Sequence, residues 1–181
     1  MAREGRKKMA REGTEMIWEL IKPYFSRKEK WGNPDKMSPE LLTFLYLFRK
    51  TFTEGVYMLI NCGYEQRKNG GGHPDGRAVD CRIVRCPFEV AEEKLREFIQ
   101  KYNLEKYIAL GVYPEWGEWR RPGFHIEIEK SKQSHPRRWG ATYARDADGS
   151  FLFKDKKLIQ KYIDYDLALK NREAYEEELL T

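Results

Sequence analysis

The sequence contains few of the residues that bind transition metals or form disulfides, with only three histidines and three cysteines among 181 residues. The cysteines at positions 62, 81 and 86 are odd in number and lack the paired spacing of a zinc ribbon. We therefore expect reduced thiols rather than a disulfide framework. The imidazole and thiolate ligands of any metal site must therefore come from these few residues.

Long hydrophobic runs are also missing. No apolar stretch approaches the roughly 18 to 20 residues that span a bilayer, and the basic N-terminus is not followed by the apolar segment of a secretory signal. We expect synthesis in the cytoplasm without a signal peptide, and no membrane insertion. The chain is 40% hydrophobic and 35% charged, which suits one domain with a sizeable core and a very polar surface.

Clustered positive charge is confined to one arm. The net charge is +5, and basic residues alternate with acidic ones except at residues 1–11. A nucleic-acid partner would call for a basic patch together with a base-reading motif, and no such motif is recognisable. An anionic cell-wall polymer, or solubility alone, would explain this charge as well.

The apolar spacing predicts both helices and strands. Ser38-Pro39-Glu40 supplies an N-cap, a first-turn proline and an acidic residue for a helix that follows at once. A second helix is expected at 89–102. Strands are expected at 56–61, 78–84, 107–113 and 124–129.

These elements predict an α+β fold. We expect a small antiparallel sheet that carries the functional site, helices packed on that sheet, and a helical C-terminal extension. The expected units are a basic arm with a short helix (1–37), the main domain (38–147) and the extension (148–181).

Two of the three histidines lie in settings that suggest a zinc site. His73 opens the stretch H-P-D-G-R-A-V-D, which ends at Asp80, and His125 lies in the alternating stretch G-F-H-I-E-I. In a strand, His125 and Glu127 would share one face. Two imidazoles and one carboxylate form a common catalytic zinc set that leaves a fourth position for water. The alternative is structural: a His73–Asp80 hydrogen bond between loop and strand, and a strand histidine with its own partner.

The same residues carry a family resemblance. The stretch from His73 to Asp80 fits the H-x-x-G-x-A-x-D signature of the zinc D-alanyl-D-alanine carboxypeptidase family. This group of LAS metallopeptidases includes VanX-like dipeptidases, phage L-alanyl-D-glutamate endolysins and the hedgehog fold. The stretches G-V-Y-P at 111–114 and G-F-H-I-E at 123–127 resemble the ending of its YcbK-like branch, so the likeness covers about residues 38–140. It implies that His73, Asp80 and His125 bind Zn²⁺.

The sequence departs from the family at two positions. Gly71 stands where the family usually has serine, and Pro122 stands where VanX-like members have their catalytic glutamate. The resemblance to the YcbK-like branch makes Glu127 the first candidate for the general base, followed by Glu118 and Glu115. The alternative for Glu127 is a cross-strand salt bridge. Arg67 lies where relatives often place an arginine that faces the substrate, although plain surface charge explains it as well.

The resemblance implies a zinc peptidase, either a carboxypeptidase or an endopeptidase, acting on peptidoglycan peptides or dipeptides that contain D-amino acids. The absence of a signal peptide fits a phage lysin that reaches the cell wall by other means or is carried in a virion, and it fits an intracellular dipeptidase. The alternative is a non-catalytic zinc-binding module with the same fold that serves a virion or another assembly partner.

Overall fold

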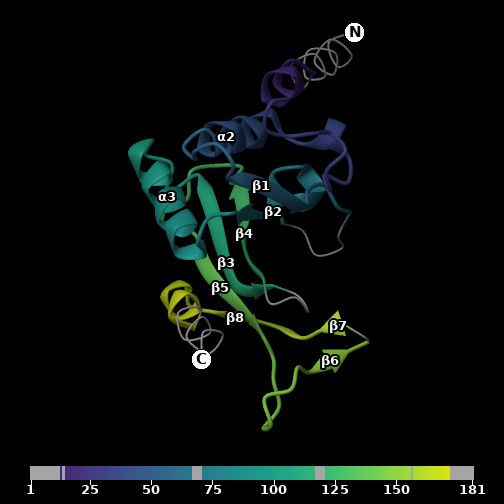
Figure 1. The fold of residues 1–181 in the computed structure, drawn as a ribbon, viewed down its shortest axis with the longest axis vertical. Helices are drawn as coiled ribbons and strands as arrows, with labels where there is room; N and C mark the ends of the chain where they lie inside the picture. Colours follow the sequence, from purple (N-terminus) through teal and green to yellow (C-terminus); the bar gives the residue numbers. More distant parts are fainter. Residues whose placement is uncertain (1–12, 14, 67–70, 117–120, 156, 172–181) are drawn as a thin grey trace.

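The computed structural model describes residues 13, 15–66, 71–116, 121–155 and 157–171. Arg67 and Glu118, two of the predicted site residues, lie outside the described residues. The described chain has an α+β fold, as predicted (Figure 1). Its elements in chain order are η1 (Pro34–Lys36), α2 (Pro39–Arg49), β1 (Tyr57–Cys62), η2 (His73–Asp75), β2 (Ala78–Val84), α3 (Phe88–Lys101), β3 (Ile108–Trp116), β4 (Arg121–Ile128), β5 (Arg138–Tyr143), β6 (Phe153–Lys154), β7 (Lys157–Leu158) and β8 (Gln160–Ile163). Helical segments at 15–21 and 165–171 lie before and after these elements.

The main sheet has six strands in the order β1-β2-β4-β3-β5-β8. Its neighbouring strands are antiparallel, as expected, except for the parallel pair β3 and β5. Strands β6 and β7 form a separate two-stranded ladder that projects away from the sheet (Figure 1). The central strands β2, β4 and β3 therefore have a partner on each side, which fixes their register and the positions of their side chains.

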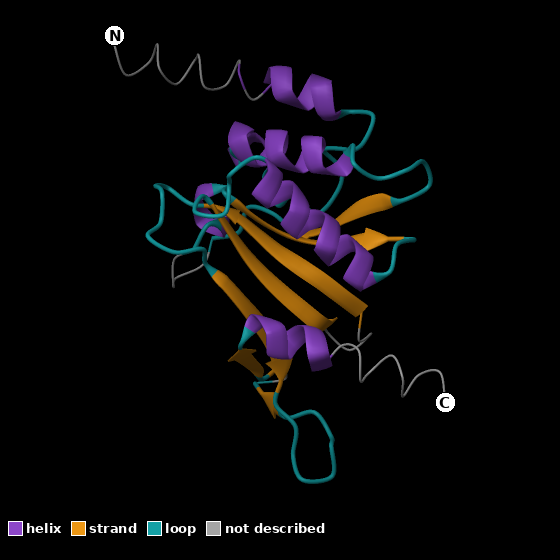
Figure 2. Cartoon of the chain, turned by 90° about the vertical axis from the view of Figure 1, so that its left-hand side faces the viewer, coloured by secondary structure: helices purple, strands orange, loops and turns teal. Residues whose placement is uncertain are grey.

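Helices cover one face of the sheet (Figure 2). The predicted cap of α2 is confirmed, because the Ser38 hydroxyl accepts a hydrogen bond from the Leu41 amide. Helix α3 packs its apolar stripe on the strands, and the rings of Phe88 and Phe124 stack with centroids 4.8 Å apart. Each such buried ring contributes about 1.5–3 kcal/mol. None of the helices formed by the described residues is long and apolar enough to cross a bilayer.

The C-terminal extension is helical only from residue 165, because residues 157–158 and 160–163 form strands. Their apolar spacing suits a helix, yet β8 pairs with β5 and makes β-branched and aromatic residues part of the sheet. Strand β5 itself was not predicted. Hydrogen bonding to the free edge of β5 stabilises these residues as a strand more than their weak helix propensity stabilises a helix, because tertiary context routinely overrides intrinsic propensity. Strand β8 consequently joins the sheet of the main domain.

Candidate metal centre

The strand register brings two of the predicted ligands together. Asp80 on β2 lies directly opposite His125 on β4, and His125 lies opposite Gly111 on β3. Opposite residues of an antiparallel pair share one face of the sheet. This face is the one that α2 and α3 leave uncovered, because the alternating residues Phe124 and Ile126 enter the core beneath the helices.

His73 reaches the same place from η2, just before β2. Gly76 ends this turn in the left-handed region at φ 68°, and a Cβ there would lie 1.8 Å from the Lys36 carbonyl oxygen. Only glycine fits this position. Nδ1 of His73 lies 2.6 Å from the Gly63 carbonyl oxygen and donates to it, which turns Nε2 toward Asp80. The Nε2 atom is buried 3.4 Å from Asp80 Oδ1 and has no hydrogen-bond partner among the described residues.

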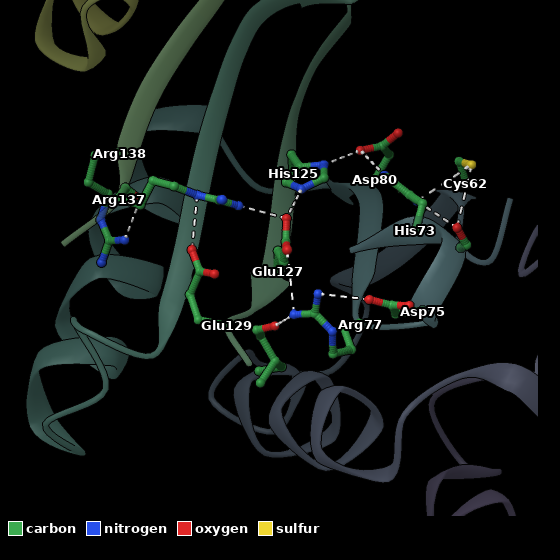
Figure 3. Close-up of polar contacts among 12 residues, drawn as sticks. Cys62, His73, Asp75, Arg77, Asp80, His125, Glu127, Glu129, Arg137 and Arg138 are labelled. Atoms are coloured by element: carbon green, nitrogen blue, oxygen red, sulfur yellow. Dashed lines mark hydrogen bonds and ion pairs between the residues drawn. The ribbon is translucent and has the colours of Figure 1, made fainter. Parts of the chain in front are cut away.

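Asp80 lies between the two imidazoles (Figure 3). Its Oδ1 atom is 2.8 Å from Nδ1 of His125, and the centroids of the two imidazole rings are 5.0 Å apart. Zinc bonds of about 2.0–2.1 Å at tetrahedral angles place neighbouring nitrogen and oxygen donors about 3.3 Å apart. The His73–Asp80 distance matches this spacing, whereas the shorter His125–Asp80 distance would have to open slightly. Asp80 Oδ1 thus lies within 3.5 Å of one nitrogen of each imidazole.

The electrostatics of the cluster favour a cation. Burial lowers the pKa of His73, but Asp80, with Cys62 and the Gly63 carbonyl, raises it to about 10. Burial raises the pKa of Asp80, but the two imidazoles lower it to about 2. The pKa of His125 is also raised, because hydrogen bonds to Asp80 and Glu127 outweigh its burial. The imidazoles hold their protons strongly beside the carboxylate, and a divalent ion would replace those protons.

Cys62 lies beside this cluster, opposite Asp80 at the end of β1. Cys62, His73 and Asp80 could hold a metal ion, since each offers a ligand atom and these atoms lie within 4.8 Å of one another. The Cys62 sulfur is 3.9 Å from Nδ1 of His73, the nitrogen that already bonds to Gly63. The Cys62 sulfur therefore lies close both to the His73 ring and to the Asp80 carboxylate.

Glu127 lies two residues beyond His125 on the same face and is only 4% exposed. One of its oxygens is 3.5 Å from Nε2 of His125 and accepts a hydrogen bond of 2.7 Å from Arg137. Its other oxygen is 3.5 Å from the Arg77 guanidinium. Burial raises the pKa of Glu127, but His125 and the two arginines lower it overall. Glu127 is therefore an ionised carboxylate beside the nitrogen of His125 that faces away from Asp80 (Figure 3).

Two neighbours enclose this arrangement. A Cβ at Gly72 would lie 2.7 Å from carbons of the Glu127 side chain, so Gly72 closes directly over the carboxylate. The Trp139 ring lies 5.3 Å from the His125 ring, and the guanidinium of Arg137 lies over Trp139 at 5.4 Å. Glu115 is held elsewhere, because it pairs with Arg145 at 2.8 Å. Among the described acidic residues proposed as the base, Glu127 is the one beside the histidines.

Sequence reasoning missed Arg137 and the placement of Cys62. Arg137 lies in the arginine-rich stretch that precedes an unpredicted strand, and its partner Glu127 is ten residues earlier. No local sequence pattern indicates that two residues ten positions apart form an ion pair. The sequence predicts Cys62 to be a reduced thiol, and no spacing pattern among the three cysteines indicates that it lies beside His73.

Comparison of the chain with protein-family models, curated proteins and solved structures gives no match. The family likeness therefore depends on the motifs in the sequence, and the proposal below depends on those motifs together with the geometry of the cluster.

Proposed function

We propose that the protein is a zinc-dependent peptidase whose ligands are His73, Asp80 and His125. The observation that supports the proposal is the position of Asp80 Oδ1, which lies 3.4 Å from Nε2 of His73 and 2.8 Å from Nδ1 of His125 on the helix-free face of the sheet. These donors come from a loop and two adjacent strands that the core holds in register. Two imidazoles and a carboxylate make up the ligand set of many catalytic zinc sites.

The surrounding residues fit zinc as well as the donors do. Metal-binding histidines generally use their second nitrogen to bond a carbonyl or carboxylate, which fixes the tautomer and the direction of the ring. His73 meets this condition through the Gly63 carbonyl, and His125 meets it through Glu127. Nε2 of His73 is buried and has no hydrogen-bond partner among the described residues, so its lone pair would be available to bind the ion once the nitrogen is deprotonated. When bound, zinc would supply Lewis-acid activation of water and of the scissile carbonyl.

Glu127 has two roles in this proposal that can be separated by experiment. Its carboxylate is ionised and holds Nε2 of His125, so it orients a ligand. It is also the candidate to accept a proton from the attacking water, since it shares the face of the donors. The ion pair with Arg137 makes Glu127 a weaker base, because the guanidinium stabilises the ionised carboxylate. The contacts therefore support the orienting role more directly.

The substrate class comes from the family resemblance. We propose cell-wall peptides that contain D-amino acids, cut by removal of a terminal residue or within a crosslink. A phage-type lysin would meet such peptides in peptidoglycan. The three donors are buried, and Trp139, which lies beside His125 on the β5 side, is partly buried.

Digestion of purified peptidoglycan followed by mass spectrometry tests this function. Zinc-loaded wild-type protein should release peptide fragments, and His125→Ala should release none. His135→Ala is the matched control, because His135 is exposed and lies outside both histidine motifs. Glu127→Gln should stop cleavage with zinc retained if Glu127 is the base, and should weaken zinc binding if it orients His125. Stoichiometric zinc without any released fragment would refute the peptidase proposal.

A non-catalytic zinc module is the second candidate, and the position of Cys62 is the observation that favours it. A thiolate added to the three donors would give four protein ligands, the closed set that is typical of structural zinc. Cys62→Ser separates the two candidates: zinc affinity should be unchanged in an open site and should fall steeply in a closed one.

A further inference from the structure

An aromatic surface continues from the metal centre across β3, β5 and β8. We name it the aromatic shelf, and it consists of four rings and one amide: Tyr113, Trp139, Tyr143, Tyr162 and Gln160. The register places them on one face. Trp139 lies opposite Gly111, and Tyr143 and Ala141 lie opposite Gln160 and Tyr162. Since Gly111 lies opposite His125, the shelf is on the metal side of the sheet.

The contacts within the shelf make it continuous. A Cβ at Gly111 would lie 2.6 Å from the Trp139 ring, so the missing side chain lets Trp139 lie flat over β3 and reach His125. The Tyr113 phenol interacts with Trp139 and Gln160. Toward the outer edge of the sheet, exposure increases: Trp139 and Tyr143 are partly buried, and Tyr162 is 73% exposed. An exposed tyrosine at a sheet edge is poorly explained by core packing.

The shelf lacks charge in a protein with 35% charged residues. The five positions of β5 and β8 that face this side are Trp139, Ala141, Tyr143, Gln160 and Tyr162. The charged neighbours Arg138 and Lys161 alternate to the opposite face. The Arg138 guanidinium donates to the carbonyl oxygen of Ile108 at 2.6 Å, so its charge is engaged away from the shelf. The Arg137 guanidinium that lies over Trp139 is paired with Glu127 at 2.7 Å and with Glu129 at 3.0 Å. A phosphate backbone would therefore meet no unpaired cation among these residues, whereas a neutral ligand with a flat apolar side and polar edges fits.

We propose that the aromatic shelf binds sugar rings of a neutral glycan chain and thereby selects peptides that are attached to a glycan. This inference rests on the proposed peptidase function. A sugar ring can lay its C–H face on an aromatic ring while its hydroxyl and acetamido groups bond phenol and amide groups, because tyrosine and tryptophan combine an apolar body with a polar edge. Three strand spacings of about 4.8 Å separate Tyr162 from His125 across the sheet, about 14 Å in total. A peptide branch could span that distance to the metal while the glycan stays on the shelf. Figure 1 shows β5 and β8 leading from the central strands toward the β6–β7 hairpin.

A soluble oligomer of N-acetylglucosamine is the probe, and an NMR titration that follows the tryptophan indole signals is the measurement. We expect saturable binding with the Trp139 indole among the shifted signals. Tyr162→Ala should weaken binding at least about fivefold, the lower limit for losing one stacked ring. Tyr162→Phe keeps the ring and should bind like wild type. Tyr102→Ala is the matched control, because Tyr102 is 52% exposed and lies at the end of α3 on the other side of the sheet.

The inference would be overturned by a lack of oligomer binding by wild-type protein, or by equal binding of the oligomer by wild type and Tyr162→Ala. Tighter binding of a single-stranded oligonucleotide than of the sugar would also overturn it, in favour of base stacking. The failure of the proposed peptidase function is a different result. His125→Ala should lose zinc binding and cleavage and still bind the oligomer. Sugar binding by a wild-type protein that cleaves no peptide would therefore support glycan binding by the aromatic shelf and refute the peptidase function.

Discussion

Replacing His125 with alanine should weaken zinc binding by about 10²- to 10³-fold. In the structure, Nδ1 of His125 lies 2.8 Å from Asp80 Oδ1 and Glu127 holds its other nitrogen. The substitution removes one of the three proposed ligands and leaves His73 and Asp80 in place. The ring lies in a buried position between His73 and Trp139, so the variant must first be shown to fold.

The magnitude follows from the free energy of zinc binding. Structural zinc sites with four ligands bind with an apparent free energy of about 10–16 kcal/mol near neutral pH. Shared equally, each ligand contributes about 2.5–4 kcal/mol. Since 1.4 kcal/mol corresponds to a factor of ten in affinity, the loss of one ligand predicts the stated range of about 10²- to 10³-fold.

Competition with a chromophoric zinc chelator measures this change on protein that has first been treated with EDTA. His135→Ala is the control, because His135 is an exposed histidine outside both motifs. Its zinc affinity should equal that of wild type, and circular dichroism should show that both variants fold. If folded His125→Ala binds zinc as tightly as wild type, or if both histidine variants lose affinity equally, the assignment of His125 as a ligand is wrong.

The remaining predictions concern the surroundings of the site. Gly72→Ala should lower zinc affinity relative to Gly13→Ala in the same competition assay, because its Cβ would displace Glu127 whereas a Cβ at Gly13 meets nothing within 4 Å; equal affinities would contradict the role of Glu127 in holding His125. In EDTA-treated protein, the raised pKa of His73 stabilises the fold, fully below about pH 6.5, and this stabilisation is lost as the pH rises through about 10. The lowered pKa of Asp80 also stabilises the fold, fully above about pH 3.8, and that stabilisation is lost as the pH falls through about 2. The free energy of unfolding, measured with urea across pH, should therefore be greatest on the acidic side of neutrality. Zinc affinity should rise with pH because zinc displaces protons. If neither quantity changes with pH, the cluster is not charged as described. Tyr165→Phe should lower the free energy of unfolding by about 1.5–3 kcal/mol, because it removes a 2.7 Å hydrogen bond to the buried Glu92, whereas exposed Tyr162→Phe should change it little; equal losses would refute this.

Much of the sheet was predictable because alternation on its central strands is strong. Strand β2 has the predicted bounds, and β1, β3 and β4 differ from the prediction by a few residues at their ends. Buried strands alternate apolar residues with the polar residues of the site, and this pattern is local. Strand β5 was missed because Arg138, Gly140 and Thr142 occupy its other face and hide its alternation. Its pairing with β3 is parallel and joins segments nearly thirty residues apart in the chain, which no local pattern reveals.

The site shows the same division between local and distant information. The motif from His73 to Asp80 and the strand around His125 were visible, and the register brings these residues together. Two features depend on how distant segments pack: the ion pair between Glu127 and Arg137, and the position of Cys62 beside His73. The sequence therefore indicated the donors, but it could not indicate which nitrogen of each histidine faces the ion.

X-ray absorption at the zinc edge of protein loaded with one ion per chain tests the central claim most directly. We expect nitrogen and oxygen scatterers at about 2.0–2.1 Å, with the multiple-scattering pattern of two imidazoles and no sulfur. A sulfur shell at about 2.3 Å that disappears in Cys62→Ser would contradict the open site and establish a closed one. Failure of the wild-type protein to retain zinc after gel filtration would contradict the metal centre itself.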